Sequence, residues 1–175
     1  SPRSSSNFSN MPMRRVWLTT DTHFQHRKLI EKGFRPADFE SQIIQRWREM
    51  VNPCDHVYHL GDVLVGNDAD MVHMLEGLPG TKTLIRGNHD HKTRTWYREN
   101  GFADCVDALV IGDVFLTHEP YQSDLPSGCT LNIHGHLHDD NHRRHEYELK
   151  PWHQLLAIEL TGYRPVLLES FRRRP

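Results

Sequence analysis

The first half of the chain alternates between short apolar runs and segments with helical spacing. The apolar runs predict buried strands at Arg15–Thr20, His56–Leu60 and Thr81–Ile85. Apolar residues that recur every third or fourth position predict helices between these strands, over Asp38–Met50 and around Met71–Leu78. A more polar helix is expected over residues 91–100, with Gly101 closing its C-terminal end.

The second half of the chain is richer in strands. Gly112 and Asp113 separate two apolar runs, which predicts a tight hairpin over residues 108–117. Further strands are expected at residues 129–133, 154–160 and 165–169, with the last two joined across Thr161–Arg164. This order predicts a mixed α/β domain with parallel pairing early and antiparallel pairing late. The polar stretch 139–153 is expected to be an exposed loop.

Length and composition narrow the class of protein. A chain of 175 residues, 37% hydrophobic and 25% charged, is typical of one globular domain and excludes a disordered chain. We expect residues 1–13 to be a disordered arm or an expression remnant, and residues 14–175 to form a single domain. The polar start is not expected to be a secretory signal, and no apolar run has the length of a transmembrane helix.

Charge and cysteine content add two further expectations. A net charge of -2 gives no general attraction to nucleic acid or to a membrane surface. The 3 cysteines show no CxxC spacing, which favours a reduced, cytoplasmic protein. The unusual feature is the content of 14 histidines, so their positions along the chain matter most.

Metal-binding residue types follow five successive predicted strands. They are Asp21 and His23, Asp62, Asn88, His118, and His136 and His138. Ligands bind beyond the carboxyl ends of strands in open α/β sheets, so we expect these side chains to converge. Imidazole and carboxylate groups bind divalent transition metals, and seven donors exceed the roughly four that a structural zinc takes. The set therefore predicts two ions roughly 3.5–4 Å apart that share one carboxylate.

The order of these motifs resembles the calcineurin-like metallophosphoesterase superfamily. The motifs are Asp21-x-His23, Gly61-Asp62, Gly87-Asn88-His89-Asp90, His118 and Gly135-His136-x-His138. The chain looks most similar to the small members without a cap domain that occur in bacteria and phages. The resemblance implies two facing mixed β-sheets flanked by helices, a four-layer sandwich with a metal pair at the strand ends.

The resemblance also implies how the ligands divide between the two ions. Asp21, His23 and His138 would hold the first metal, and Asn88, His118 and His136 the second. Asp62 would bridge them. The aspartates supply only two negative charges, so the loaded site would stay positive, which suits a phosphate substrate.

The expected mechanism uses water activated between the two ions. Such a water loses its proton near neutral pH, and the metals also hold the phosphate oxygens in the transition state. We expect His89 to protonate the leaving group, with Asp90 orienting and charging its imidazole. A carboxylate partner would raise the pKa of His89, so that the ring starts protonated at pH 7.

Other polar residues near the motifs are weaker candidates. Substrate contacts are assigned to His26, Arg27, Arg86 and His134, and Arg35 is a further candidate for phosphate. The basic pair Arg143-Arg144 is interpreted as ordinary solvated side chains rather than as a nucleic-acid contact.

The favoured function is a phosphodiesterase with two metals. A chain of 175 residues has no room for a cap domain, which would leave the site open to a diester with two substituents. The alternatives are a nuclease acting on RNA or DNA, a phosphomonoesterase, and a non-catalytic scaffold of the same fold. Manganese is the favoured metal, with iron, nickel or zinc as alternatives. The expected partner is a small-molecule or nucleotide phosphate ester; nucleic acid is not favoured, no membrane is expected, and oligomeric state is open.

Overall fold

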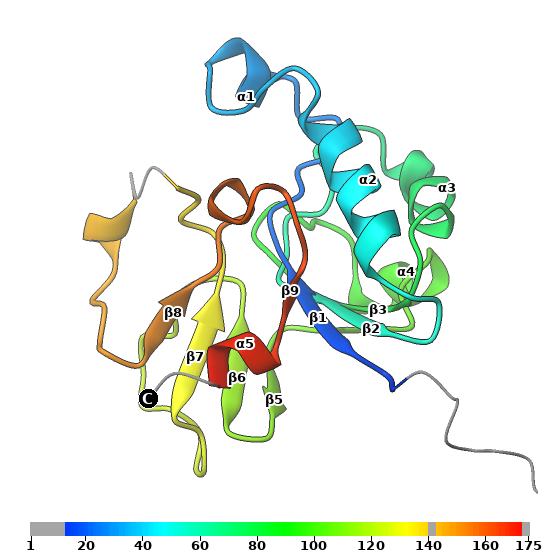
Figure 1. The fold of residues 1–175 in the computed structure, drawn as a ribbon. Helices are drawn as coiled ribbons and strands as arrows, with labels where there is room; N and C mark the ends of the chain where they lie inside the picture. Colours follow the sequence, from blue (N-terminus) through cyan, green and yellow to red (C-terminus); the bar gives the residue numbers. More distant parts are fainter. Residues whose placement is uncertain (1–12, 140–142, 173–175) are drawn as a thin grey trace, which may run out of the picture.

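Two β-sheets form the centre of the structure, a computed structural model that describes residues 13–139 and 143–172 (Figure 1). The five-stranded sheet has the order β4-β3-β2-β1-β9. Its first four strands are parallel, and β9 runs antiparallel to β1. The strands are β1 Val16–Thr19, β2 His56–His59, β3 Thr81–Ile85, β4 Asp104–Val106 and β9 Val166–Leu167.

The second sheet has four strands in the order β5-β6-β7-β8. Strand β5 pairs antiparallel with β6, whereas β6 with β7 and β7 with β8 are parallel pairs. The strands are β5 Leu109–Ile111, β6 Val114–Thr117, β7 Leu131–His134 and β8 His153–Leu155. Both sheets are therefore mixed, as expected for the fold class.

Helices flank the sheets. Helices α2 Phe39–Met50, α3 Met71–Glu76 and α4 Arg94–Glu99 lie on the side of the five-stranded sheet away from the second sheet (Figure 1). The short α1 Lys28–Glu31 stands apart at the top of the view, and α5 Glu169–Arg172 follows β9. Single 3-10 turns are η2 Asp68–Asp70, η3 Arg144–Glu146 and η4 Ile158–Thr161.

The strands of the first sheet separate two apolar cores because successive side chains point to opposite faces. Trp17 packs with the helices, while Leu18 packs toward the second sheet. Leu84 and Ile85 divide in the same way on β3. Burial on both faces of this parallel sheet explains why β1 has apolar residues at successive positions.

The strands and helices predicted for the first half are confirmed, and so is the hairpin at the start of the second half. The strands, α2 and the hairpin lie where the pattern placed them, and Gly112 at the hairpin turn has a φ of 59°. The end of the polar helix is also as expected, because Gly101 follows α4 with a φ of 113°.

The expectation of antiparallel pairing late in the chain holds for the β5–β6 hairpin and for β9 beside β1, but not for the rest of the second sheet. Strands β6, β7 and β8 are parallel neighbours, so a crossover rather than a hairpin joins them. The strand expected at 154–160 ends at Leu155, and the chain continues into η4. Gly162 and Tyr163, with φ of 64° and 60°, then turn the chain toward the first sheet. Strands β8 and β9 therefore belong to different sheets, which short apolar runs alone cannot reveal.

The remaining expectations concern irregular segments. In the polar stretch 139–153, residues 143–146 are exposed and include η3, while residues 140–142 lie outside the described part. Of the expected arm, residues 1–12 are likewise outside it. Among the described residues, no helix has the length and apolar character needed to cross a membrane.

Candidate metal centre

The seven residues predicted as metal ligands come together at one edge of the two sheets. They are Asp21, His23, Asp62, Asn88, His118, His136 and His138. They follow the carboxyl ends of β1, β2, β3, β6 and β7. This confirms the convergence expected from the chain order, and it unites the ends of both sheets in one site.

The backbone at this site is strained. Asp21, His23, Asp62, His136 and His138 have φ values of 47°, 46°, 60°, 72° and 51°. Residues other than glycine rarely adopt this left-handed backbone conformation, which costs on the order of 1–3 kcal/mol per residue. Such strain concentrates where the structure fixes a side-chain direction for function.

Glycines allow the loops to approach one another. Gly61 has a φ of 106°, and a Cβ there would lie 2.6 Å from His118 Nδ1 and 2.7 Å from the backbone N of Gly87. A Cβ on Gly87 would collide with Asp62, and one on Gly135 with the side chain of Asp21. The glycine that precedes each of these ligand motifs is therefore needed for close packing of the loops.

Asp21, His23 and His138 form the first cluster. Asp21 Oδ1 lies 3.7 Å from His23 Nε2 and 3.5 Å from His138 Nε2. Both Asp21 Oδ1 and His23 Nε2 are buried and have no hydrogen-bond partner. Buried polar atoms without partners are rare in proteins. Donors about 2.1 Å from a shared ion lie roughly 3–3.5 Å apart, so this spacing fits a cation between them.

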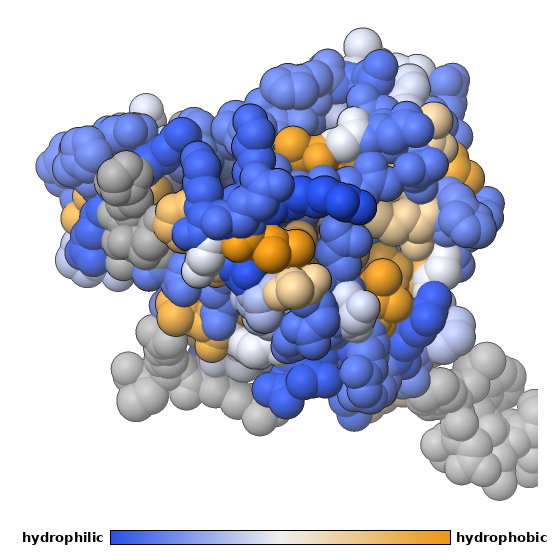
Figure 2. Space-filling model, turned by 90° about the horizontal axis from the view of Figure 1, so that it is seen from above, coloured by the Kyte–Doolittle hydropathy of each residue, from blue (hydrophilic) through white to orange (hydrophobic). Residues whose placement is uncertain are grey.

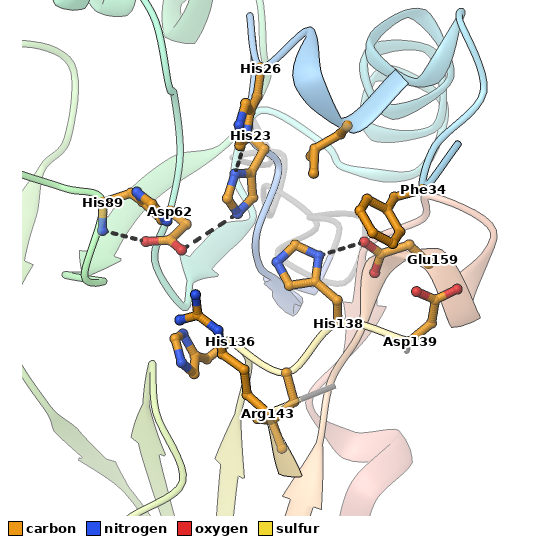
Figure 3. A pocket seen from close by; sticks show the side chains of 12 residues that line it. His23, His26, Phe34, Asp62, His89, His136, His138, Asp139, Arg143 and Glu159 are labelled. Carbon is orange, nitrogen blue, oxygen red and sulfur yellow. Dashed lines mark hydrogen bonds and ion pairs between the residues drawn. The ribbon is translucent and has the colours of Figure 1, made fainter. Parts of the chain in front are cut away.

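Asp62, Asn88, His118 and His136 form the second cluster. His118 Nε2 lies 3.3 Å from Asp62 Oδ2, 2.8 Å from Asn88 Oδ1 and 3.2 Å from His136 Nδ1. Asp62 Oδ2 is also 3.5 Å from His23 Nε2 of the first cluster. One carboxylate oxygen therefore faces both clusters, as a bridging ligand must; Figure 3 shows its contact with His23.

The opposite nitrogens of the cluster histidines are engaged by the protein. His118 Nδ1 donates to the carbonyl of Leu60 at 2.7 Å, and His138 Nδ1 donates to Glu159 Oε1 at 2.8 Å. Each of these bonds leaves Nε2 directed into the site, which is the usual arrangement around metal-binding histidines. His23 Nδ1 lies 2.9 Å from His26 Nδ1.

Arg35 holds Glu159 and the loop that carries Asp21 in place through hydrogen bonds. Its guanidinium donates to Glu159 Oε1 at 2.8 Å and to the backbone carbonyls of Asp21 and Thr22. The side chain is fully buried, so it cannot contact phosphate in the cavity. The assignment of Arg35 as a phosphate contact was wrong, because its charge pairs with Glu159.

Buried His59 joins two ligand loops. Burial lowers the pKa of His59 to about 3, so the ring is neutral. Gly61 N–H donates to its Nδ1 at 3.1 Å, which leaves Nε2 to donate to Thr22 Oγ1 at 2.9 Å. Thr22 Oγ1 in turn donates to the carbonyl of Val63. This chain of bonds ties the loop after β1 to the loop after β2.

The electrostatics show that the site holds ionised carboxylates. Burial would raise the pKa of Asp62, but hydrogen bonds and charge from His118 and His23 hold it well below its usual range. Burial works against the charge of His118, yet Asp21 and Asp62 raise its pKa to about 9. Without metal, protonated imidazoles offset the negative charge of these carboxylates. A bound divalent cation would supply that positive charge instead.

His89 and Asp90 do not pair as expected. Asp90 Oδ2 accepts backbone N–H groups of Gly87 and Asp62 at 2.7 and 2.8 Å, and Oδ1 accepts that of Val63 at 3.1 Å. The carboxylate therefore holds the loops that carry the ligands, and burial raises the pKa of Asp90 to about 6. Burial lowers the pKa of His89, so the expected raised pKa was also wrong.

The four residues predicted to contact substrate do not lie together around one cavity. His26 lines the cavity beside His23, whereas Arg27 is exposed and lines a different hollow. Arg86 is paired with Asp107 at 3.0 Å and donates to the carbonyl of Lys92. His134 is buried, and its Nδ1 donates to the carbonyl of Gly135. His26 alone among these four lines the cavity over the first cluster, while Arg86 lines a second hollow beside Asn88 and His118.

A cavity of about 180 Å³ lies over the first cluster and Asp62. Phe34, Arg143 and Glu159 are among the lining residues that sequence reasoning missed. Phe34 and Glu159 lie outside every motif, and Arg143 was interpreted as a solvated member of a basic pair. Only the fold brings these segments to the cavity, so the local sequence holds no signal for them. Seen from above, this face has a few hydrophobic groups within a largely hydrophilic surface (Figure 2).

Comparisons with known proteins agree with the site. The family model for calcineurin-like phosphoesterases matches residues 14–169. An uncharacterized protein of Methanocaldococcus jannaschii is 33% identical, over 91% of this chain and 90% of its own length. The Gene 66 protein of Mycobacterium phage D29 is 26% identical, over 84% of this chain and 94% of its own. The crystal structure of a protein of unknown function from Aquifex aeolicus superposes with a TM-score of 0.73 at 22% identity, covering 91% of this chain and 98% of that one.

Proposed function

The chain belongs to the calcineurin-like phosphoesterase family, and on that premise we propose that it is a metal-dependent phosphodiesterase with two metal sites. The family makes it a hydrolase of phosphate esters that depends on metal. The observation that supports the count of two is the position of Asp62 Oδ2, 3.5 Å from His23 Nε2 and 3.3 Å from His118 Nε2.

We assign Asp21, His23 and His138 to one ion and Asn88, His118 and His136 to the other, with Asp62 between them. When bound, such a metal pair supplies an activated water and neutralises charge on the phosphate. Manganese is our first choice of metal, and iron, nickel and zinc have the same ligand preferences.

His89 is our candidate for the proton donor to the leaving group. Its ring lines the cavity, and within the described chain its imidazole nitrogens make no hydrogen bond. Its backbone N–H donates to Asp62 Oδ1 at 2.9 Å, which fixes the residue beside the site. Asp90 is a positioning residue in this scheme, because it binds the backbone of both loops rather than the ring.

The space around the site favours diesters over monoesters. The cavity with Phe34 lies on one side of the ligands, and a second hollow beside Asn88 and His118 lies on another. A diester has two substituents to place, and these two hollows offer a place for each. A monoester would use only one.

The test is hydrolysis of bis(p-nitrophenyl) phosphate and p-nitrophenyl phosphate by chelator-stripped protein with Mn²⁺, Ni²⁺, Zn²⁺ or Mg²⁺ added back. We expect metal-dependent cleavage that favours the diester. Asp62→Asn should lose both bound metal and hydrolysis, while Asp124→Asn, an exposed aspartate outside both hollows, should retain both. Preference for the monoester would reject the diesterase, and an Asp62→Asn protein that keeps two ions would reject the bridging role.

A further inference from the structure

The cavity over the metal centre has two chemically different ends. Figure 3 shows Arg143 crossing the cavity with its guanidinium directed toward His136 and Asp62. Phe34 lies at the other end, beyond His138. One end therefore offers a cation beside the reaction site, and the other offers an aromatic surface.

Arg143 is suited to bind phosphate. It is the only lysine or arginine among the described residues that line this cavity. Arg35 is sequestered by Glu159, but the guanidinium of Arg143 makes no hydrogen bond or ion pair with any described residue. Two donors of a guanidinium match two oxygens of one phosphate, which a lone ammonium cannot do.

Phe34 is suited to bind a planar group. It is 51% exposed, whereas most large apolar side chains of the described chain are buried. It follows α1, and its backbone N–H donates to the carbonyl of Leu29 of that helix at 2.9 Å, a residue that also lines the cavity. Stacking on an exposed ring removes apolar surface of both partners from water.

From these contacts, and on the basis of the proposed function, we propose that the substrate is a phosphate ester with a planar aromatic substituent, such as a nucleoside phosphodiester. Arg143 binds its phosphate oxygens, and Phe34 stacks on the aromatic group. Arg143 thus binds the phosphate of every ester, whereas Phe34 favours those esters that carry an aromatic group.

A comparison of two ligands with two variants tests this. Phenylphosphonate and methylphosphonate share one phosphonate group and cannot be hydrolysed, so calorimetric titration of the Mn²⁺-loaded protein measures binding without turnover. The wild type should bind phenylphosphonate about tenfold more tightly, which is about 1.4 kcal/mol. Phe34→Ala should abolish this preference and leave methylphosphonate unchanged.

Arg143→Ala should weaken both ligands equally, by about 10- to 100-fold, since it removes bonds to the shared group. Arg143→Lys should recover part of the lost affinity, because it restores the positive charge without the paired donors of the guanidinium. The matched control is Val110→Ala, a 46%-exposed apolar residue of β5 outside the cavity, which should change neither ligand. Metal content of each variant is measured in parallel and should stay at the wild-type value.

Two results would overturn the inference. Equal loss of both ligands in Phe34→Ala would show that this ring does not select an aromatic group. Unchanged binding in Arg143→Ala would show that its side chain is merely solvated. Failure of the proposed function is a separate result, namely no hydrolysis of any ester by wild-type protein that holds two ions.

Discussion

At the scale of single residues, the site is defined by atoms that point inward without a hydrogen-bond partner. Asp21 Oδ1 and His23 Nε2 are buried and make no hydrogen bond, while the opposite atoms of the same side chains do. Leaving a buried polar atom without a hydrogen bond costs about 1–3 kcal/mol, a large part of a protein stability of about 5–15 kcal/mol. These costs are removed when a cation takes the inward atoms as ligands.

His89 provides the residue-scale prediction. If it protonates the leaving group, His89→Ala should lower turnover about 10²- to 10⁴-fold for an alkyl ester, whose alkoxide needs a proton. A p-nitrophenyl ester should lose far less, because its leaving group departs as an anion. Metal content should be unchanged, since the imidazole of His89 belongs to neither ligand cluster. Both rates and bound metal are measured on the same preparations.

The control for this variant is His91→Ala. His91 is exposed, and its ring lies 6.3 Å from that of His89, so it shares the neighbourhood without facing the metal centre. Both activities should survive in this variant. An equal fall for alkyl and p-nitrophenyl esters in His89→Ala would remove the residue from the role of proton donor.

At the scale of elements, the sequence predicts β1, β2 and β3 because each is a short run with apolar residues that ends at a polar motif, whereas β4 was not predicted. The ligand set could be predicted for a related reason, since each ligand follows such a run. The order of pairing in the second half could not, because a run such as residues 154–160 is compatible with a strand or with η4. Arg143 and Phe34 could not be predicted either, since their roles depend on the path of loops.

Asp55 supports a prediction about how β1 and β2 are joined. This fully buried carboxylate accepts the backbone N–H of Arg15 and Asn52 and the indole N–H of Trp17, at 3.0, 2.9 and 3.0 Å. Burial would raise its pKa, but these bonds lower it. Asp55→Asn turns an N–H group toward at least one donor, so the free energy of unfolding at pH 7 should fall by about 1–3 kcal/mol.

The pH dependence follows from the direction of this shift. A carboxylate with a lowered folded pKa stabilises fully above its unfolded value of about 3.9, and the contribution is lost as pH falls through the folded pKa. Urea unfolding of wild type and Asp55→Asn should therefore differ most at neutral pH and converge below about pH 4. Asp124→Asn, at an exposed position, should match the wild type throughout. A constant difference between wild type and Asp55→Asn at every pH would contradict this account.

At the scale of the whole molecule, the fold and the metal centre are separable. The two apolar cores pack helices on one side of the first sheet and the second sheet on the other, and their residues are not metal ligands. The centre lies instead at one end, where loops from both sheets meet. The chain should therefore keep its secondary structure without metal. The ligand loops should be less stable in that state, because their buried carboxylates and imidazoles lack the cation.

Removal of metal should accordingly lower stability without unfolding the protein. Binding to the folded state alone, at a free metal concentration 100 times the dissociation constant, adds about 2.7 kcal/mol. For a chain of this length that corresponds to roughly 5–10 °C in Tm, so chelation should lower Tm by this amount and Mn²⁺ should restore it. The far-ultraviolet circular dichroism should stay the same. Asp62→Asn, which lacks the shared ligand, should show a Tm that barely responds to chelator or Mn²⁺. A wild-type Tm that changes with neither chelator nor Mn²⁺ would mean that the clusters do not bind metal in the folded protein.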